Sequence, residues 1–334
     1  MRTVFYEKIR RDVETALFDD KNKGEAILKT MVKRNDVNLT GLMIVTEDNP
    51  MSPILYLDDY YDMYREGVSY SDIQTEVIRI IRQNEVPMIN PEQLIAFDQA
   101  KENVFLQVVD QKMNQHWLKD KVYHVEDDLA CTYHMYIEAH GVEASIPIRR
   151  EYLNVWNVSA DELRTIAEEN LRGEEWELAS MNEMICKFLE DPELEMEYGS
   201  AQELPLPEPE EMYVLKLDRQ QYGASVLLRK DVMKQVGERL GGDFYILPSS
   251  QHELIVMPVK TAPVFDKLQE MVREINETEV DPQDRLSDDL FYYDREEERM
   301  TKAKYYFAEK LGISKDEMES ALPEKKRYRE EVER

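Results

Sequence analysis

The chain has 334 residues, of which 42% are hydrophobic and 34% charged, and its formal net charge is −28. These values exclude global disorder and allow two domains of ordinary size. An acidic surface repels the phosphates of nucleic acids and anionic lipids, so we expect no direct nucleic-acid binding and no membrane association. The charge suits a basic protein partner, or simply keeps the protein soluble.

Cellular location is predicted from the N-terminus and the cysteines. The first helical stretch is broken by charges every few residues and lacks the continuous apolar core of a signal peptide. No stretch approaches the roughly 18 apolar residues that a membrane span needs. Cys131 and Cys186 are far apart and fit no metal or redox spacing. We therefore expect a cytoplasmic protein with two reduced thiols.

Residues 1–88 are predicted to form a first α+β unit. An amphipathic helix around residues 3–18 is followed by three short alternating runs, which predict a three-stranded antiparallel meander. A second helical pattern covers residues 71–84, with Ser71 and Gln74 as its capping box.

Residues 89–190 are predicted to form a second α+β unit. Asn90 and Pro91 resemble a helix start, and Gly141 resembles a turn between two strands. Two later helices begin at capping boxes, one with Ser159 and Glu162 and the other with Ser180 and Glu183. The predicted strands and helices of this unit cover residues 102–110, 128–139, 141–148, 159–171 and 180–190.

The C-terminal part begins after an acidic, proline-rich stretch, residues 191–211, which we predict to be a linker. Residues 212–296 follow the order β-α-β-β-α-β, typical of a split βαβ layout, with residues 222–228 as a possible extra strand. Residues 297–334 are predicted to be a helical tail with a capping box at Ser314 and Glu317, and residues 295–334 carry no net charge. The fold class is therefore α+β, with antiparallel sheets that carry helices on one face.

A group of histidines raises the question of a metal site. Four of the chain's five histidines fall within 25 residues, together with Cys131, Asp127, Asp128 and Glu138. Their spacing matches no zinc pattern, so ordinary surface or hydrogen-bonded histidines are the favoured interpretation. Strand alternation places Cys131 on an apolar face and the neighbouring histidine on a polar one. The weak metal candidates are His116, His124, His134 and His140.

A candidate catalytic site lies in the stretch "DFYILPSSQHELIVMP", residues 243–258. Ser250 and His252 share one side of an extended backbone, so a serine–histidine couple is conceivable. The alternative is a β-hairpin with Pro248–Gln251 at its turn, which explains the polar residues without catalysis. No glycine flanks the serines, as a nucleophile elbow would require. The weak catalytic candidates are Ser249, Ser250, His252 and Glu253.

Acidic and aromatic residues gather in residues 56–64 and 286–298. Paired carboxylates such as Asp58 and Asp59 can bind a cation, but their place at a helix N-terminus explains them equally well. No phosphate-binding loop or dinucleotide motif is present, and no cofactor is predicted.

Four stretches stand out: "YGASVLLRKDVMKQVGERLGGDFYILPSSQHELIVMP", "VREINETEVDPQDRLSDDLFYYDRE", "SPILYLDDYYDMYREG" and "SADELRTIAEEN". On these stretches the chain resembles a family of uncharacterised proteins found in gut Clostridia. The resemblance covers roughly residues 1–297, and the C-terminal half is also faintly similar to another Gram-positive family. The resemblance implies an intracellular bacterial protein, and it brings no established activity and no catalytic residues.

Three hypotheses for function follow. The first is a non-enzymatic cytosolic module that binds another protein. The second is an acidic nucleic-acid mimic that inhibits a DNA- or RNA-binding protein. The third is a hydrolase using Ser249, Ser250 and His252, which requires the His252 imidazole to reach both a serine and a carboxylate.

Overall fold

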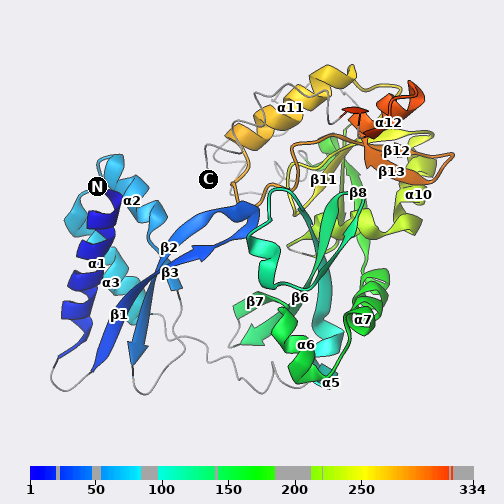
Figure 1. Ribbon diagram of the computed structural model, residues 1–334. Coiled ribbons are helices and arrows are strands. Elements are labelled where there is room, and N and C mark those ends of the chain that lie inside the picture. Colours follow the sequence, from blue (N-terminus) through cyan, green and yellow to red (C-terminus); the bar gives the residue numbers. More distant parts are fainter. Residues whose placement is uncertain are drawn as a thin grey trace. The chain divides into compact units, whose positions relative to one another are not determined.

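The computed structural model describes residues 1–19, 23–46, 54–83, 97–139, 142–184, 212–219, 221–315 and 317–318 (Figure 1). The chain divides into two compact units. Unit 1 comprises Met1–Val104, Met113–Val122 and His134–Ala160, and unit 2 comprises Phe105–Lys112, Tyr123–Tyr133 and Asp161–Arg334. These interleaved units differ from the consecutive domains predicted from the sequence. The predicted linker, 191–211, and the predicted helix start at Asn90 lie outside the described residues.

The first element of unit 1 is helix α1, Arg2–Leu17, which leads into a three-stranded sheet. The sheet has the order β1-β2-β3, and both neighbouring pairs are antiparallel. This arrangement confirms the predicted meander. Its strands are β1, Gly24–Val32, β2, Asn38–Thr46, and β3, Ile54–Tyr56.

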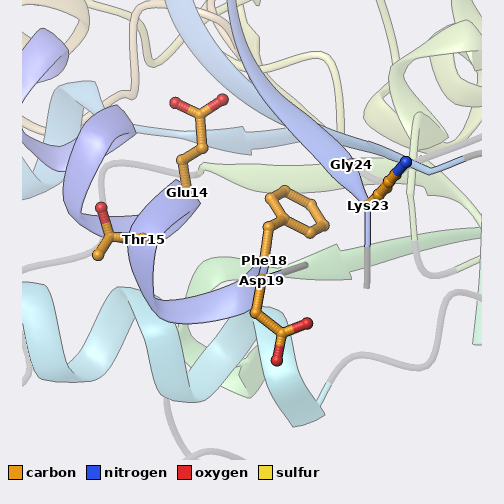
Figure 2. A pocket seen from close by; sticks show the side chains of 6 residues that line it. All are labelled: Glu14, Thr15, Phe18, Asp19, Lys23 and Gly24. Carbon is orange, nitrogen blue, oxygen red and sulfur yellow. The ribbon is translucent and has the colours of Figure 1, made fainter. Parts of the chain in front are cut away.

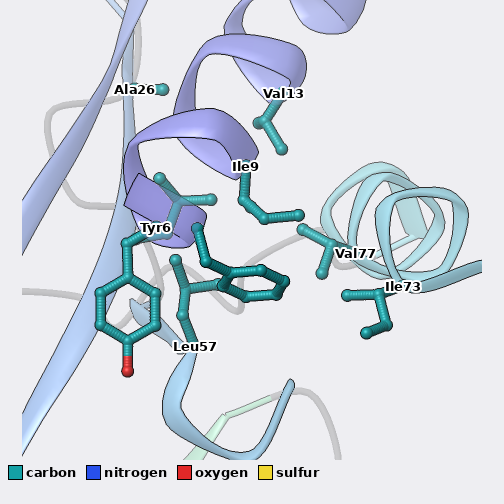
Figure 3. Packing of buried hydrophobic residues seen from close by; sticks show 9 residues of the cluster. Tyr6, Ile9, Val13, Ala26, Leu57, Ile73 and Val77 are labelled. Carbon is teal, nitrogen blue, oxygen red and sulfur yellow. The ribbon is translucent and has the colours of Figure 1, made fainter. Parts of the chain in front are cut away.

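Helices cover one face of this sheet. Ile9 and Val13 of α1 pack with Ile73 and Val77 of helix α3, Tyr70–Gln83, and all four side chains are fully or almost fully buried (Figure 3). Between them in the chain lies helix α2, Asp58–Arg65. The sheet contributes alternate side chains to the same core, as the two-residue period of a strand requires. These are Ala26, Leu28, Leu42, Ile44 and Leu55.

The predicted capping box of α3 is wrong by two residues. Ser69 Oγ accepts a hydrogen bond from the backbone N–H of Asp72, and donates to its carboxylate at 2.7 Å. The helix therefore begins at Tyr70, and Ser71 lies inside its first turn. Gly67, with φ of +107°, adopts a conformation that favours glycine in the turn after α2.

Unit 1 also contains several short elements, one inside the meander and the others after it in sequence. Asn35 and Asp36 adopt left-handed conformations in the connection between β1 and β2. Strand β7 pairs with the His134–Ala139 part of strand β6. These elements are η1, Arg34–Asp36, α5, Phe97–Ala100, η2, Lys101–Asn103, η3, Trp117–Asp120, β7, Val142–Pro147, and α6, Arg150–Trp156.

Unit 2 is built on a six-stranded sheet with the order β13-β12-β10-β11-β9-β8. Helix α10 connects β9 to β10, and β11 lies between these two strands in the sheet. Helix α11 connects β11 to β12, and β10 lies between those two. Both helices are thus crossovers of a split βαβ unit, as predicted. The strands are β8, Trp176–Ser180, β9, Tyr213–Leu217, β10, Phe244–Leu247, β11, Leu254–Pro258, β12, Phe291–Asp294, and β13, Arg299–Lys302; the helices are α10, Lys230–Leu240, and α11, Phe265–Thr278.

Two parts of unit 2 differ from the sequence-based expectations. Residues 222–228, predicted as a possible extra strand, instead contain the 3₁₀ helix η4, Gly223–Leu228. Five of its six residues, Gly223–Leu227, are buried. Strand β13 and helix α12, Ala303–Lys310, fall in the range predicted as a helical tail, and β13 pairs with β12. β12 and β13 form a hairpin across residues 295–298, which the helical prediction for the tail overlooked.

The remaining elements of unit 2 include a tight hairpin. β5, Tyr123–Glu126, pairs with the start of β6, Leu129–Ala139, around a two-residue turn. Asp127 and Asp128 in this turn both have positive φ angles, as a type I′ turn requires. The other elements are β4, Val104–Asp110, and α7, Ala160–Gly173.

Candidate functional site

The predicted serine and histidine candidates lie in the connection between β10 and β11, whose antiparallel pairing confirms the expected hairpin. This connection is packed against a second segment of backbone. The N–H groups of Leu286 and Ser287 donate to the carbonyls of Ser249 and Pro248, and the N–H of Gln251 donates to the carbonyl of Asp284. Ser249 and Gln251 are buried as a result. The polar residues thus belong to a buried connection.

The side chains of Ser250 and His252 do not form a nucleophile–base couple. Ser250 Oγ accepts a hydrogen bond from the backbone N–H of His252 at 3.0 Å. The imidazole Nδ1 accepts one from the backbone N–H of Tyr222 at 3.3 Å, and Nε2 lies 3.5 Å from a carboxylate oxygen of Asp284. The imidazole therefore has a carboxylate neighbour, but no serine hydroxyl within the described part of the chain is bonded to it.

Neighbouring residues hold this connection in place. The ring of Tyr222 stacks on His252 with centroids 5.7 Å apart. A Cβ at Gly223 would lie 2.4 Å from the His252 carbonyl oxygen, so this close approach requires glycine. The buried amides of Gln107 and Gln251 hydrogen-bond to each other, and Gln251 also donates to Asp284. Glu253 is half-buried. These contacts account for the polar residues as parts of the packing.

The other histidine candidates have separate partners. His116, which is largely exposed, bonds through Nδ1 to Asp36 at 2.8 Å. His134 is buried, lies 3.2 Å from Ser145 Oγ through Nδ1, and stacks on Trp117. His140 lies outside the described residues.

His124 is different, because it lies beside two further potential metal ligands. It is directly opposite Cys131 in the β5–β6 register, and Glu126 follows two positions later on the same face of β5. One ligand atom from each residue lies within 4.8 Å of the other two. Cys131 is fully buried with a free thiol, whereas His124 and Glu126 are partly exposed. The hairpin therefore presents sulfur, nitrogen and oxygen at one place.

The surroundings of this group are partly buried and contain several charges. Nδ1 of His124 lies 2.7 Å from the hydroxyl of Tyr133. Burial, helped by the charge of Arg164, lowers the pKa of His124, and burial raises the pKa of the Cys131 thiol. Both changes favour the neutral forms. Nζ of Lys230 lies 3.5 Å from Oε1 of Glu126.

Sequence reasoning selected His124 but missed Glu126. Asp127 and Asp128 were considered as acidic ligands, but they form the turn. A signal was available, because a two-residue aspartate turn between two alternating runs predicts that His124 faces Cys131. The histidine cluster concealed this signal, since proximity in sequence linked His124 to histidines that have other partners.

The acidic–aromatic stretches hold structural carboxylates. Asp58, which is buried, accepts hydrogen bonds from Arg2 at 2.5 Å, from Tyr6 at 3.0 Å and from the backbone N–H of Thr40 at 2.6 Å. Asp59 is exposed at the start of α2. Adjacent aspartates thus have unrelated environments, and Asp58 acts as an anchor between α1, α2 and β2.

In the second stretch, Asp289 binds two lysines. Lys302 Nζ lies 2.9 Å from Asp289 and 3.9 Å from Asp110, and Lys304 lies 2.6 Å from Asp289. The Lys302 side chain is only 2% exposed. This arrangement is a buried ion network and leaves little room for a substrate.

The sheet of unit 1 has a second face, opposite the helices, which we call the outer face. In the strand register Ile27 faces Met43, which in turn faces Ile54, and Tyr56 faces Gly41. Ile27 is 36% exposed, and the others except Gly41 are half-buried. None of the larger side chains belongs to the helix-side core. The outer face consists of Ile27, Met43, Val45, Ile54 and Tyr56.

An open pocket lies at the end of this sheet. Glu14, Thr15 and Phe18 from the end of α1 line it with Lys23 and Gly24 from the start of β1, and Asp19 completes the lining (Figure 2). The Phe18 ring occupies the space beside Gly24, where a Cβ would meet it at 2.2 Å. Glu14 is already paired with Arg10 at 2.8 Å. The pocket thus shows no convergent reactive groups.

The fold and these sites define an α+β protein whose polar clusters are mostly structural. The chain belongs to a family of unknown function, DUF5688, whose model matches residues 2–295. This match agrees with the extent of the resemblance expected from the sequence. No curated protein and no solved structure matches the chain significantly. Within the described ranges, no helix combines the length and apolar character needed to cross a membrane.

Proposed function

We propose that this protein is a non-enzymatic module that binds another protein on the outer face of the unit 1 sheet. The observation that carries the proposal is the concentration of apolar side chains on that face. Contiguous apolar surface rimmed by polar residues is typical of protein-interaction sites. Glu25 and Lys29 lie on the same side of β1, and they would lie at the edge of such an interface.

The edge position of β1 also supports the proposal. β1 spans nine residues, and β2 is its only strand partner in the part of the chain that the structure describes. An edge strand offers backbone N–H and C=O groups to an incoming strand. The Ala26 carbonyl of β1 already accepts a hydrogen bond from Arg10 at 3.4 Å, so a partner strand would use the rest of this edge together with the outer face.

A basic protein is the partner that the charge favours. The net charge of −28 would attract a positively charged protein and raise its association rate. The apolar face would then supply the contact area. We place this function in the cytoplasm, where the free thiol of Cys131 would remain reduced.

Replacing Ile27 with arginine tests the proposal. The change puts a positive charge on the edge strand of the outer face, directly opposite Met43, and we expect it to weaken binding at least about tenfold, or roughly 1.4 kcal/mol. Partners would be captured from extracts of the cells that make the protein and quantified by mass spectrometry. Their affinity for wild-type and variant proteins would then be measured with the purified partner.

Val4→Arg is the matched control, because Val4 is 71% exposed on α1 in the same unit. A partner that binds Ile27→Arg as tightly as Val4→Arg would contradict the proposed face. The salt dependence of binding distinguishes partners held by charge from partners held by apolar contact. Charge-driven binding weakens as the Debye length falls from about 10 Å at 0.1 M to about 3 Å at 1 M salt. A partner that nucleic acid displaces would instead favour the acidic-mimic hypothesis.

A further inference from the structure

We infer that the β5–β6 hairpin holds a zinc ion through His124 Nε2, a carboxylate oxygen of Glu126 and Cys131 Sγ. This inference is independent of the proposed protein-binding face. It rests on three side chains of different chemistry that the register of one hairpin brings together.

The geometry suits a tetrahedral ion. Zinc binds sulfur at about 2.3 Å and nitrogen or oxygen at about 2.0–2.2 Å, so its ligand atoms lie roughly 3.4–3.8 Å apart. One ligand atom from each of the three residues lies within 4.8 Å of the other two, and His124 Nε2 is 4.0 Å from Glu126 Oε2. Small rotations of the partly exposed His124 and Glu126 side chains would close the remaining distance around the fixed Cys131.

The hydrogen bond of His124 orients its ring for this role. A metal-bound histidine usually donates its other ring N–H to an oxygen, which fixes the tautomer and the ring direction. The Tyr133 hydroxyl occupies that position, 2.7 Å from Nδ1. If Nδ1 carries the hydrogen, the lone pair of Nε2 points away from Tyr133 and is available to the ion.

The ligand types select the metal. A thiolate and an imidazole bind zinc and other borderline or soft ions, and they disfavour magnesium and calcium, which prefer oxygen. Three protein ligands leave a fourth position for water. Binding would release one proton from the Cys131 thiol to solvent, and Glu126 would exchange its contact with Lys230 for the ion.

The test uses untagged, metal-free full-length protein titrated with zinc alone and, separately, with cobalt alone. We expect one ion per chain by calorimetry, and a sulfur-to-cobalt charge-transfer band in the near ultraviolet. Cys131→Ser should abolish that band, and His124→Gln should weaken zinc binding at least about tenfold. Because His124 is partly exposed, its variant can be expected to fold even if Cys131→Ser does not.

Two matched controls change the chain's other cysteine and a largely exposed histidine outside the proposed site. Cys186→Ser and His116→Gln should both leave the stoichiometry, the affinity and the cobalt band unchanged. The inference is overturned if the wild-type chain binds no stoichiometric zinc, or if His124→Gln binds it as tightly as wild type. Loss of the cobalt band in Cys186→Ser would also overturn it.

Discussion

Replacing Lys302 with methionine is expected to lower the free energy of unfolding by about 3–5 kcal/mol. Lys302 is the buried cation between Asp289 and Asp110, and its removal leaves those carboxylates without their central counter-ion. Ser287 donates to Asp110 at 3.4 Å and cannot neutralise it. Urea denaturation followed by circular dichroism would measure the change.

Lys304→Met is the matched control, since Lys304 binds the same carboxylate but is 25% exposed. We expect it to cost no more than about 1 kcal/mol, as partly exposed ion pairs usually do. If both variants lower the free energy of unfolding by the same amount, burial does not determine how strongly this ion network stabilises the protein.

The same network predicts how acid affects stability. Burial by itself would raise the pKa of Asp289, but Lys302 and Lys304 outweigh it and hold that pKa below the usual range. A carboxyl with a lowered folded-state pKa stabilises the protein above its unfolded pKa, and this contribution is lost as pH falls through the folded value. Stability should therefore fall with acidification below about pH 4, the usual aspartate range.

Asp289→Asn tests this pH dependence. Stability curves of this variant and of wild type would be compared across that acidic range. The variant should be less stable at neutral pH, and its stability should change less with acidification. A wild-type slope that Asp289→Asn leaves unaltered would rule out Asp289 as the group responsible.

Asp58→Ala is the second substitution for which we expect a large effect, about 2–4 kcal/mol. It removes one acceptor that serves Arg2, Tyr6 and the Thr40 N–H, and it takes the carboxylate away from the buried Tyr6 hydroxyl and the half-buried Thr40 N–H. The loss should be confined to unit 1. Hydrogen exchange with mass spectrometry would detect it as faster exchange in α1 and β2.

The adjacent Asp59→Ala is an unusually close control. Asp59 is exposed in the first turn of α2, so its removal should change stability by no more than about 0.5 kcal/mol. If the backbone amides of α1 and β2 exchange equally fast in both variants, Asp58 contributes only through the helix dipole. The anchoring role of Asp58 would then be wrong.

Local sequence patterns predicted much of the secondary structure. The α1 amphipathic pattern, the β1–β3 meander and the β10–β11 hairpin each depend on residues close together in the chain. The capping contacts at Ser180 with Glu183, and at Ser314 with Glu317, are likewise confirmed. Gly241 ends α10 with φ of +74°, a left-handed conformation that favours glycine at a helix C-terminus.

Other predictions failed where one partner is distant in sequence. η4 depends on packing that buries all but its last residue. The loop at Ser249–His252 was correctly placed in a hairpin, but its burial depends on residues 284–287. Local propensity cannot specify such contacts, because packing and hydrogen bonding override it.

The sequence alone therefore determined the α+β class, the acidic charge and most element positions, since these follow from composition and short-range periodicity. The tertiary structure separated His124 from the other histidines, whereas its hairpin register with Cys131 could have been predicted from the aspartate turn. It also distinguished Asp58 from Asp59, and buried Lys302 between two carboxylates. The reason is physical: the chemistry of a side chain depends on its burial and its neighbours, which long-range folding brings together.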